Sequence, residues 1–470
     1  MEAAQFGQFV SIQLSKKRKT PLYIQLADQL AYRIREGKLA PGLPLPPVRH
    51  LASLLSINPA TAAAAYKELE RNGLIMTRRG SGSIVSDSAA LPQISLSLTE
   101  DAPSPGTVDM SRITPDPRLF PMDTFKDIIG GVIERDGPFA FSYSESQGWR
   151  PLRESIAATL AGEGIHTDPD LIQIVSGAQQ GIDIAARALL RHGDYAVTED
   201  PTYPGAAASF RALGARILGI PLTPSGIEMD RLEEGVSRFA PRLFYLMPDV
   251  QNPTGLSYAP SIKGRLMGLA GRSDFYILED DYLGGLATGA GRSLKSMDRN
   301  DRVIYLRSIS SLFIPGFRLA FLVMPERLAP ILRKVKYLTD IATSGLTQRI
   351  FDLYLRRRLW DAHVATLRQV FSDRRAFALS LARRHLPPDV LIQPSSIAPS
   401  LWLTLPGSVS SKDIAAKGKE AGFAFTDGAP FFLREGNTAH LRISFASASL
   451  PDMEKGFALL GSLCRGEALS

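Results

Sequence analysis

The N-terminal part of the chain spaces its apolar residues with the period of short helices. Between residues 21 and 34 they stand three or four places apart, which predicts an amphipathic helix. Prolines at the start of residues 46–55 predict a second helix, and an Asn-Pro pair predicts a third over residues 58–73. Residues 74–85 then predict a hairpin with two arginines at its tip.

A different pattern follows after an intervening stretch. Residues 87–110 are rich in Ser, Pro, Ala and Thr and show no sustained period, which indicates a linker; a short strand over Ile94–Leu98 is the alternative. From Asp109 onward short apolar strands alternate with helical patterns, so the sequence predicts an α/β fold with a largely parallel sheet. The candidate strands are Ile172–Val175, Tyr195–Thr198, Arg216–Ile220, Leu243–Met247, Phe275–Glu279, Val303–Leu306 and Leu319–Val323.

Charge divides the chain in the same way. Twelve basic and six acidic side chains occur up to Ser88, so this short segment carries about +6 of the net +7 of all 470 residues. A basic segment joined to a nearly neutral body indicates either a module that binds a polyanion or a solubilising tail. Cys464 is the only cysteine, and six scattered histidines show no ligand spacing. We therefore expect a cytoplasmic protein with no metal site, no secretory leader and no membrane span.

Polar motifs follow several of the predicted strands. Ligands of parallel sheets bind at the carboxyl ends of the strands, so motifs at these places point to one common site. Small residues at a helix start suit a phosphate, a tyrosine can stack on a flat ring, and a carboxylate can hold a ring nitrogen protonated. The motifs are Ser176–Gln180, Asp200–Gly205, Asp249–Gly255, Glu279–Tyr282 and Ser308–Phe321.

The N-terminal segment resembles the GntR-type DNA-binding domain, in which three helices and a hairpin form a winged helix. The motifs that carry the resemblance are Pro21-Leu-Tyr, Leu45-Pro-Pro-Val-Arg-His-Leu-Ala, Ala65-Tyr-Lys-Glu-Leu-Glu and Arg79-Gly-Ser-Gly. In such a domain the third helix enters the major groove and the wing meets the backbone or the minor groove. The resemblance implies DNA contacts by Arg49, Thr61, Lys67, Arg78 and Arg79. Ala64 stands where that family often has an arginine, which puts direct base readout by this helix in doubt and leaves methyl contacts to thymine.

The remainder resembles a fold-type-I aminotransferase, which uses pyridoxal phosphate (PLP), and the whole chain resembles the MocR/GabR family of transcriptional regulators. The resemblance implies that Asp280 pairs with the pyridine nitrogen, that Asn252 and Tyr282 bind the phenolic oxygen and that Tyr203 stacks on the ring. It also implies that Arg442 binds the carboxylate of an amino-acid ligand. The alternative is that Arg442 is a surface arginine on a strand and binds no ligand. The implied phosphate ligands are Ala178, Gln179, Ser308, Ser310 and Arg318.

Tyr143 and Ser311 stand at two further positions of this resemblance. Tyr143 matches a tyrosine that reaches the phosphate of the partner subunit, which would require a homodimer; a core tyrosine is the alternative. Ser311 stands where the family has the lysine that bonds covalently to the cofactor aldehyde and moves a proton. A hydroxyl does neither well at neutral pH. Lys295, Lys334 and Lys336 match no anchoring motif, so we expect no catalytic residue.

The resemblance therefore predicts a winged helix over residues 1–86, a linker over 87–110, a large domain over 111–360 that includes an N-terminal small-domain segment, and a small domain over 361–470. We expect a regulator of transcription that binds a double-stranded DNA operator. Its effector would be noncovalent PLP, a related B6 vitamer or a PLP–amino-acid adduct. The chain would form a head-to-tail homodimer and would have little or no transaminase activity. The alternatives are an aminotransferase with an added DNA-binding module, a scaffold that has lost the cofactor, and an introduced lysine-to-serine change in a normal regulator.

Overall fold

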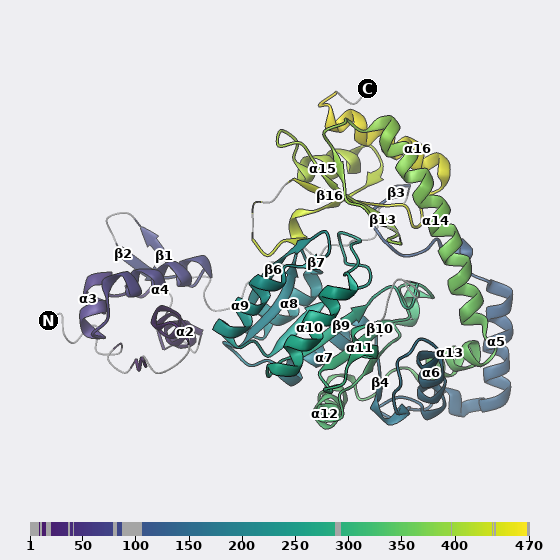
Figure 1. Cartoon of the computed structure of the whole chain (residues 1–470), viewed down its shortest axis with the longest axis horizontal. Coiled ribbons are helices and arrows are strands. Elements are labelled where there is room, and N and C mark those ends of the chain that lie inside the picture. The colour runs from purple at the N-terminus through teal and green to yellow at the C-terminus, as the bar shows by residue number, and fades with distance from the viewer. Residues whose placement is uncertain are drawn as a thin grey trace. The chain divides into compact units, whose positions relative to one another are not determined.

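The computed structural model describes residues 9, 12–15, 20–35, 38–40, 42–78, 82–86, 106–286, 293–395, 397–434, 436 and 439–467. The chain divides into two compact units, Met1–Ser95 and Leu96–Ser470 (Figure 1). No helix among the described residues is long and apolar enough to cross a membrane.

The N-terminal unit contains the predicted three helices and hairpin. Its elements are α2 (Leu22–Arg35), α3 (Val48–Leu54), α4 (Pro59–Arg71) and the antiparallel strands β1 (Ile75–Arg78) and β2 (Gly82–Val85). Helix α4 begins where the sequence predicts, because the side chain of Asn58 accepts a hydrogen bond from the Ala60 amide at 2.8 Å. The buried Tyr66 hydroxyl donates to the Pro46 carbonyl at 2.7 Å and fixes α4 against the turn before α3. The prediction of a winged helix is confirmed.

An eight-stranded sheet forms the centre of the second unit. Its order is β4-β11-β10-β9-β8-β5-β6-β7, and the neighbours from β10 to β6 run parallel. Strand β11 is antiparallel to both β10 and β4, and β7 is antiparallel to β6. The α/β fold with a largely parallel sheet is thus confirmed. The strands are β4 (Ile172–Val175), β5 (Tyr195–Asp200), β6 (Arg216–Thr223), β7 (Gly226–Ile227), β8 (Leu243–Leu246), β9 (Tyr276–Asp281), β10 (Val303–Ser308) and β11 (Ala320–Val323).

Helices cover both faces of this sheet, because successive strand residues point to opposite sides. One face packs against α7 (Ala178–Leu189), α8 (Pro204–Ala212) and α12 (Ala329–Asp340). The other face packs against two groups of helices. These are α9 (Met229–Phe239), α10 (Pro260–Arg272) and α11 (Leu294–Met297), and then α5 (Met122–Asp136), α6 (Arg150–Gly162), α13 (Gly345–Arg356) and the start of α14 (Leu359–His385).

The smaller part of this unit is built on a second sheet of order β12-β13-β16-β15. Helix α14 leads into it from the large sheet, and its last turns pack with α16 (Figure 1). Val108–Asp109, at the end of the predicted linker, form strand β3 and pair with β14 (Phe423–Ala424); residues 87–105, including the alternative strand, lie outside the described residues. The remaining elements are β12 (Leu391–Ile392), β13 (Ser400–Thr404), β15 (Thr426–Asp427), β16 (His440–Ser444), α15 (Ser411–Glu420) and α16 (Leu450–Cys464), and the short 3-10 helices Pro117–Leu119, Gly137–Phe141, Pro169–Leu171, Pro315–Phe317 and Ala429–Phe431.

Candidate functional site

The buried carboxyl group of Asp280 lies at the end of the central strand β9. Its Oδ2 accepts a hydrogen bond of 2.7 Å from the Tyr245 hydroxyl on β8, whereas Oδ1 has no partner among the described residues. Burial raises the pKa of this carboxyl to about 7, and Tyr245 opposes the rise. A buried acid with one open oxygen is suited to a ligand that brings a positively charged N–H group.

A cationic side chain, Arg318, lies close to the start of α7. Gly177 precedes this helix with φ +97°, and the guanidinium of Arg318 lies so close that a Cβ on Gly177 would collide with it. The first N–H groups of a helix have no partners within the helix, so Arg318 and the start of α7 together favour a phosphate. Ala178 is the first residue of α7, and the buried Ser308 ends β10.

Ser310, another predicted phosphate ligand, is hydrogen-bonded within the loop between β10 and β11. Its buried hydroxyl donates to the Leu319 carbonyl at 3.1 Å and accepts from the Leu319 amide at 2.5 Å. In this structure the hydroxyl therefore closes the base of the loop between β10 and β11. Because both of these bonds go to the backbone, Ser310 shapes the loop, and its role as a phosphate ligand stays a prediction.

Tyr203 and Gln179 lie together beside the start of α8. The amide of Gln179 donates to the Gly205 carbonyl at 3.1 Å and to the Ser209 hydroxyl at 2.9 Å. A Cβ on Gly205 would collide with both Gln179 and the ring of Tyr203, so glycine is needed for this close approach. Gln179 thus contacts the helix that positions the aromatic ring.

Arg442 and Asn252 come from distant parts of the sequence and meet at the site. Arg442 on β16 donates to Asn252 Oδ1 at 2.8 Å and to the Ser111 carbonyl at 3.0 Å, and its guanidinium lies 5.0 Å from the centre of the Phe431 ring. Burial raises the pKa of the Tyr282 hydroxyl, and the nearby charge of Arg442 opposes this rise. The structure therefore brings together Asn252, Tyr282 and Arg442, which the sequence had placed on three separate motifs.

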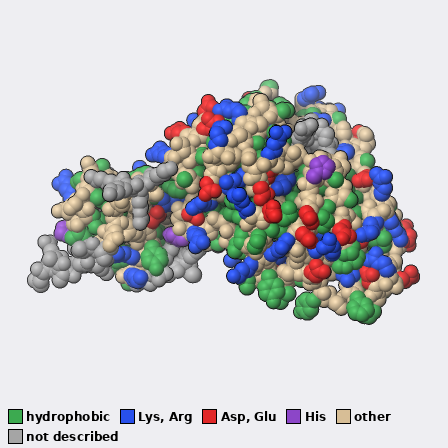
Figure 2. All heavy atoms as spheres, turned by 60° about the horizontal axis from the view of Figure 1, so that its bottom comes forward, with side chains coloured by type: hydrophobic (Ala, Val, Ile, Leu, Met, Phe, Trp, Pro, Cys, Tyr) green, Lys and Arg blue, Asp and Glu red, His purple; other side chains and the backbone are tan. Residues whose placement is uncertain are grey.

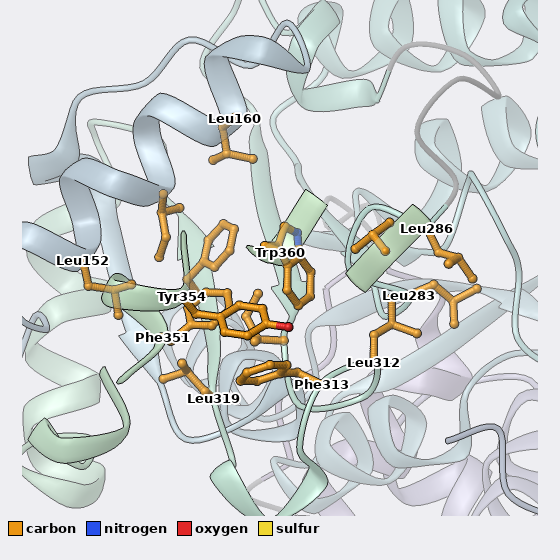
Figure 3. Close-up of a cluster of buried hydrophobic side chains, with 14 of the residues drawn as sticks. Leu152, Leu160, Leu283, Leu286, Leu312, Phe313, Leu319, Phe351, Tyr354 and Trp360 are labelled. Carbon is orange, nitrogen blue, oxygen red and sulfur yellow. The ribbon is translucent and has the colours of Figure 1, made fainter. Parts of the chain in front are cut away.

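Ser311 lies directly beside this group. Its hydroxyl donates to the Tyr282 carbonyl, and its amide donates to the Ser308 hydroxyl at 3.3 Å. The next two residues, Leu312 and Phe313, are buried in the hydrophobic cluster of Figure 3, where the Phe313 ring lies 4.6 Å from that of Tyr354. The loop is thus fixed on both sides of residue 311.

The three lysines considered from the sequence are placed away from Ser311 or engaged elsewhere. Lys295 Nζ donates to the Val303 carbonyl at 2.8 Å, and the buried Lys336 forms an ion pair with Asp340. Lys334 is exposed on α12. No described contact brings any of these amines to Ser311.

Sequence reasoning missed two groups that support the site. Tyr245 holds Asp280, and its place as the one polar-ended side chain in a buried strand was a usable signal. Asp340 at the end of α12 accepts hydrogen bonds from Ser176 at 2.9 Å and from Gln180 at 2.7 Å, and so ties down the turn before α7. Nothing in the local sequence of α12 indicates that Asp340 supports this turn.

The predicted DNA contacts lie on the surface of the N-terminal unit where they are described. Arg49 is exposed on α3, Lys67 is exposed on α4, and Thr61 is half-buried near the start of α4. Arg79 and the side chain of Arg78 lie outside the described residues. Tyr143 in the second unit is 91% exposed, which excludes the core alternative.

Comparison with known proteins identifies both units. The family model for aminotransferase class I and II matches residues 120–458, and the model for bacterial regulatory proteins of the gntR family matches residues 22–85. An uncharacterized HTH-type transcriptional regulator of Bacillus subtilis, YdfD, is 26% identical over 96% of this chain and 98% of its own length. The probable rhizopine catabolism regulatory protein MocR of Rhizobium meliloti is 27% identical over 79% of each chain.

A solved structure matches the second unit. The α-aminoadipate aminotransferase LysN of Thermus thermophilus, complexed with N-(5'-phosphopyridoxyl)-L-leucine, has a TM-score of 0.73 and 29% identity, and the match covers 77% of this chain and 93% of that one. The family model spans more than half of the chain, and the fold agrees with it. The chain therefore belongs to the aminotransferase class I and II family and carries a GntR-type winged helix in front of its aminotransferase fold.

Proposed function

We propose that this protein is a DNA-binding transcriptional regulator that senses PLP, another B6 vitamer or a PLP–amino-acid adduct without a covalent bond. Transaminase activity would be little or none. One observation carries the proposal. The site keeps polar groups that suit the cofactor, with Asp280 at their centre, but it has the hydroxyl of Ser311 where the family resemblance expects an amine.

The residues present suit the cofactor. The phosphate would bind at Arg318 and the first amides of α7, the ring would lie against Tyr203, and Asp280 would hold the pyridine nitrogen in its protonated form. Asn252 and Tyr282 would face the phenolic oxygen. Bound PLP supplies an electron sink for amino-acid chemistry. The open Oδ1 of Asp280 supports this fit, because an unpartnered buried carboxylate oxygen is costly without a ligand.

An amino-acid portion of the ligand would be recognised by Arg442. Its planar guanidinium suits a carboxylate in a two-pronged arrangement, and burial strengthens such a contact. One nitrogen of this guanidinium already donates to Asn252. An arriving carboxylate would therefore change a contact that joins the two sheets of this unit, which is a route from ligand binding to a change of conformation.

The case for lost catalysis rests on the chemistry of residue 311. A serine hydroxyl is neutral at physiological pH and forms no stable carbon–nitrogen link to an aldehyde. In this structure it also donates to the Tyr282 carbonyl, so its proton is committed to the backbone. Lys295 and Lys336, two of the lysines considered from the sequence, are engaged elsewhere, which supports the proposal.

The exposed aromatic residues support a homodimer. Phe139, Phe141 and Tyr143 are exposed close together in sequence, and Tyr337, Leu338 and Ile341 are exposed at the end of α12. Figure 2 shows hydrophobic side chains standing out along the lower edge of the second unit. In a head-to-tail dimer, as the family resemblance implies, Tyr143 would reach the phosphate site of the partner, and two winged helices would read paired half-sites of an operator.

Replacement of Ser311 by lysine tests the site assignment. The wild-type protein should change the absorbance spectrum of added PLP but release it on denaturation, whereas Ser311→Lys should hold PLP through a link that borohydride makes permanent. Ser311→Arg is the matched control, because it adds a cation of similar length that forms no such link. If Ser311→Lys bound PLP no more firmly than Ser311→Arg after reduction, residue 311 would not face the cofactor.

A second function is favoured by one finding, the similarity to an aminotransferase over 77% of the chain. In that case the protein would be a working enzyme with an added DNA-binding module. Incubation with an amino donor, a keto acid and PLP separates the two. If the wild type forms product, and forms it as fast as Ser311→Lys does, the result would support the enzyme and contradict a sensor without activity.

A further inference from the structure

Helix α4 presents an unusual surface to the groove that it would enter. Its inner side is buried through Ala62, Ala65, Tyr66 and Leu69. On its outer side Ala60 and Ala63 are exposed and Ala64 is half-buried. The first two turns of a recognition helix contact base edges, so the groups available there are chiefly methyl groups.

Three polar side chains near this surface are engaged within the protein, and the half-buried Thr61 offers a single hydroxyl group, which does not form a two-bond contact with a base edge. Asn58 accepts from the Ala60 amide at 2.8 Å as the helix cap. Glu68 binds Arg71 at 2.5 Å, and Glu70 accepts from the Thr77 amide at 3.0 Å. These contacts hold the side chains that flank the alanines. Direct readout by paired donors and acceptors, as arginine reads guanine or asparagine reads adenine, therefore has little support on this surface.

One base feature of the major groove matches a methyl surface. Thymine presents its C5-methyl group there, and alanine side chains make apolar contact with it. The exposed cations Arg49 and Lys67 lie on α3 and α4 and suit the phosphates on either side, which would set the position of the helix without reading sequence.

We propose that α4 recognises its operator through thymine methyl groups, with Ala60, Ala63 and Ala64 as the residues that determine specificity. The inference rests on the proposed DNA-binding function and names the chemistry of the partner: a duplex with thymines at the contacted positions of the major groove. Burying one methyl group contributes about 0.8 kcal/mol, which is about fourfold in affinity.

The experiment begins with selection of binding duplexes from a random library by the full-length protein. The region of the selected duplex that the bound protein protects from nuclease cleavage is then mapped. Within this protected region deoxyuridine replaces single thymines, which removes the methyl group and keeps the base pairing. We expect affinity to fall about fourfold for each contacted thymine. The same replacement outside the protected region is the control on the DNA.

A double variant, Ala63→Gly with Ala64→Gly, completes the test. The ratio of affinities for thymine and deoxyuridine duplexes should fall toward one in this variant, and because it is a ratio, any loss of helix stability cancels. If duplexes are selected but deoxyuridine has no effect, or the contacted positions are G·C pairs, the inference is wrong and the DNA-binding function stands. If no duplex is retained, both fail.

Discussion

Replacement of Asp280 by asparagine changes the charge of the cofactor site with almost no change of shape. Burial raises the pKa of the Asp280 carboxyl from 3.8 to about 7. A rise of about three units corresponds to about 4 kcal/mol, at about 1.4 kcal/mol per unit. Ionised Asp280 therefore destabilises the ligand-free protein by up to about this amount, and a ligand with a protonated ring nitrogen would relieve it.

The direction of the pH dependence follows from where the proton is held. The folded protein keeps the Asp280 proton until about pH 7, whereas the unfolded chain releases it near pH 4, so stability is lost as the pH rises between these values. Asparagine does not titrate. The free energy of unfolding of Asp280→Asn, minus that of the wild type, should grow by about 3 kcal/mol between pH 5 and pH 8.

Urea unfolding of the ligand-free proteins at several pH values measures this difference. Burial also raises the pKa of Glu199 to about 7 and that of Glu279 to about 8. Glu279 contributes equally to both proteins, whereas the charge of Asp280 adds to the rise at Glu199, so part of the measured difference passes through Glu199. The same variant should bind PLP more weakly, because an amide does not stabilise a protonated pyridine nitrogen. A difference in stability that stays constant with pH would refute the raised pKa of the Asp280 carboxyl.

Three further predictions concern other parts of the protein. Arg442→Lys keeps the charge but loses the planar fork, so it should weaken a PLP–amino-acid adduct about tenfold in an absorbance titration and leave PLP alone nearly unchanged; equal losses would contradict its role. Lys67→Ala should weaken binding to all duplexes alike and reduce the salt dependence of affinity by about one ion, and a sequence-specific loss would argue against a phosphate contact. Gly177→Ala places a methyl group against Arg318, so it should weaken the binding of PLP more than that of pyridoxal, which lacks the phosphate. A similar loss of affinity for both would show that the phosphate does not bind beside Arg318.

The sequence predicts most of the architecture because its signals are local. The Asn58 cap and helical spacing predict α4, and polar residues after apolar strands predict which edge of the sheet carries the site. Asp280 and Asn252 could be assigned to that edge because the carboxyl ends of parallel strands meet there.

The details that sequence could not supply are contacts between distant segments. Arg442 and Asn252 are 190 positions apart, and their hydrogen bond depends on how the two sheets of the second unit pack. The engagement of Ser310 with the backbone of Leu319 depends on the path of a loop, and the support that Asp340 gives to Ser176 depends on where α12 ends. Residue type and spacing do not encode these pairings.

The loop that carries Ser311 is secured by its neighbours. Leu312 and Phe313 are fully buried and Ser310 bonds to the backbone, so contacts on both sides of position 311 hold the chain in addition to the bond from the Ser311 hydroxyl to the Tyr282 carbonyl. Under the proposed function, the change from an enzyme to a receptor would then require one residue and no rebuilding of the loop.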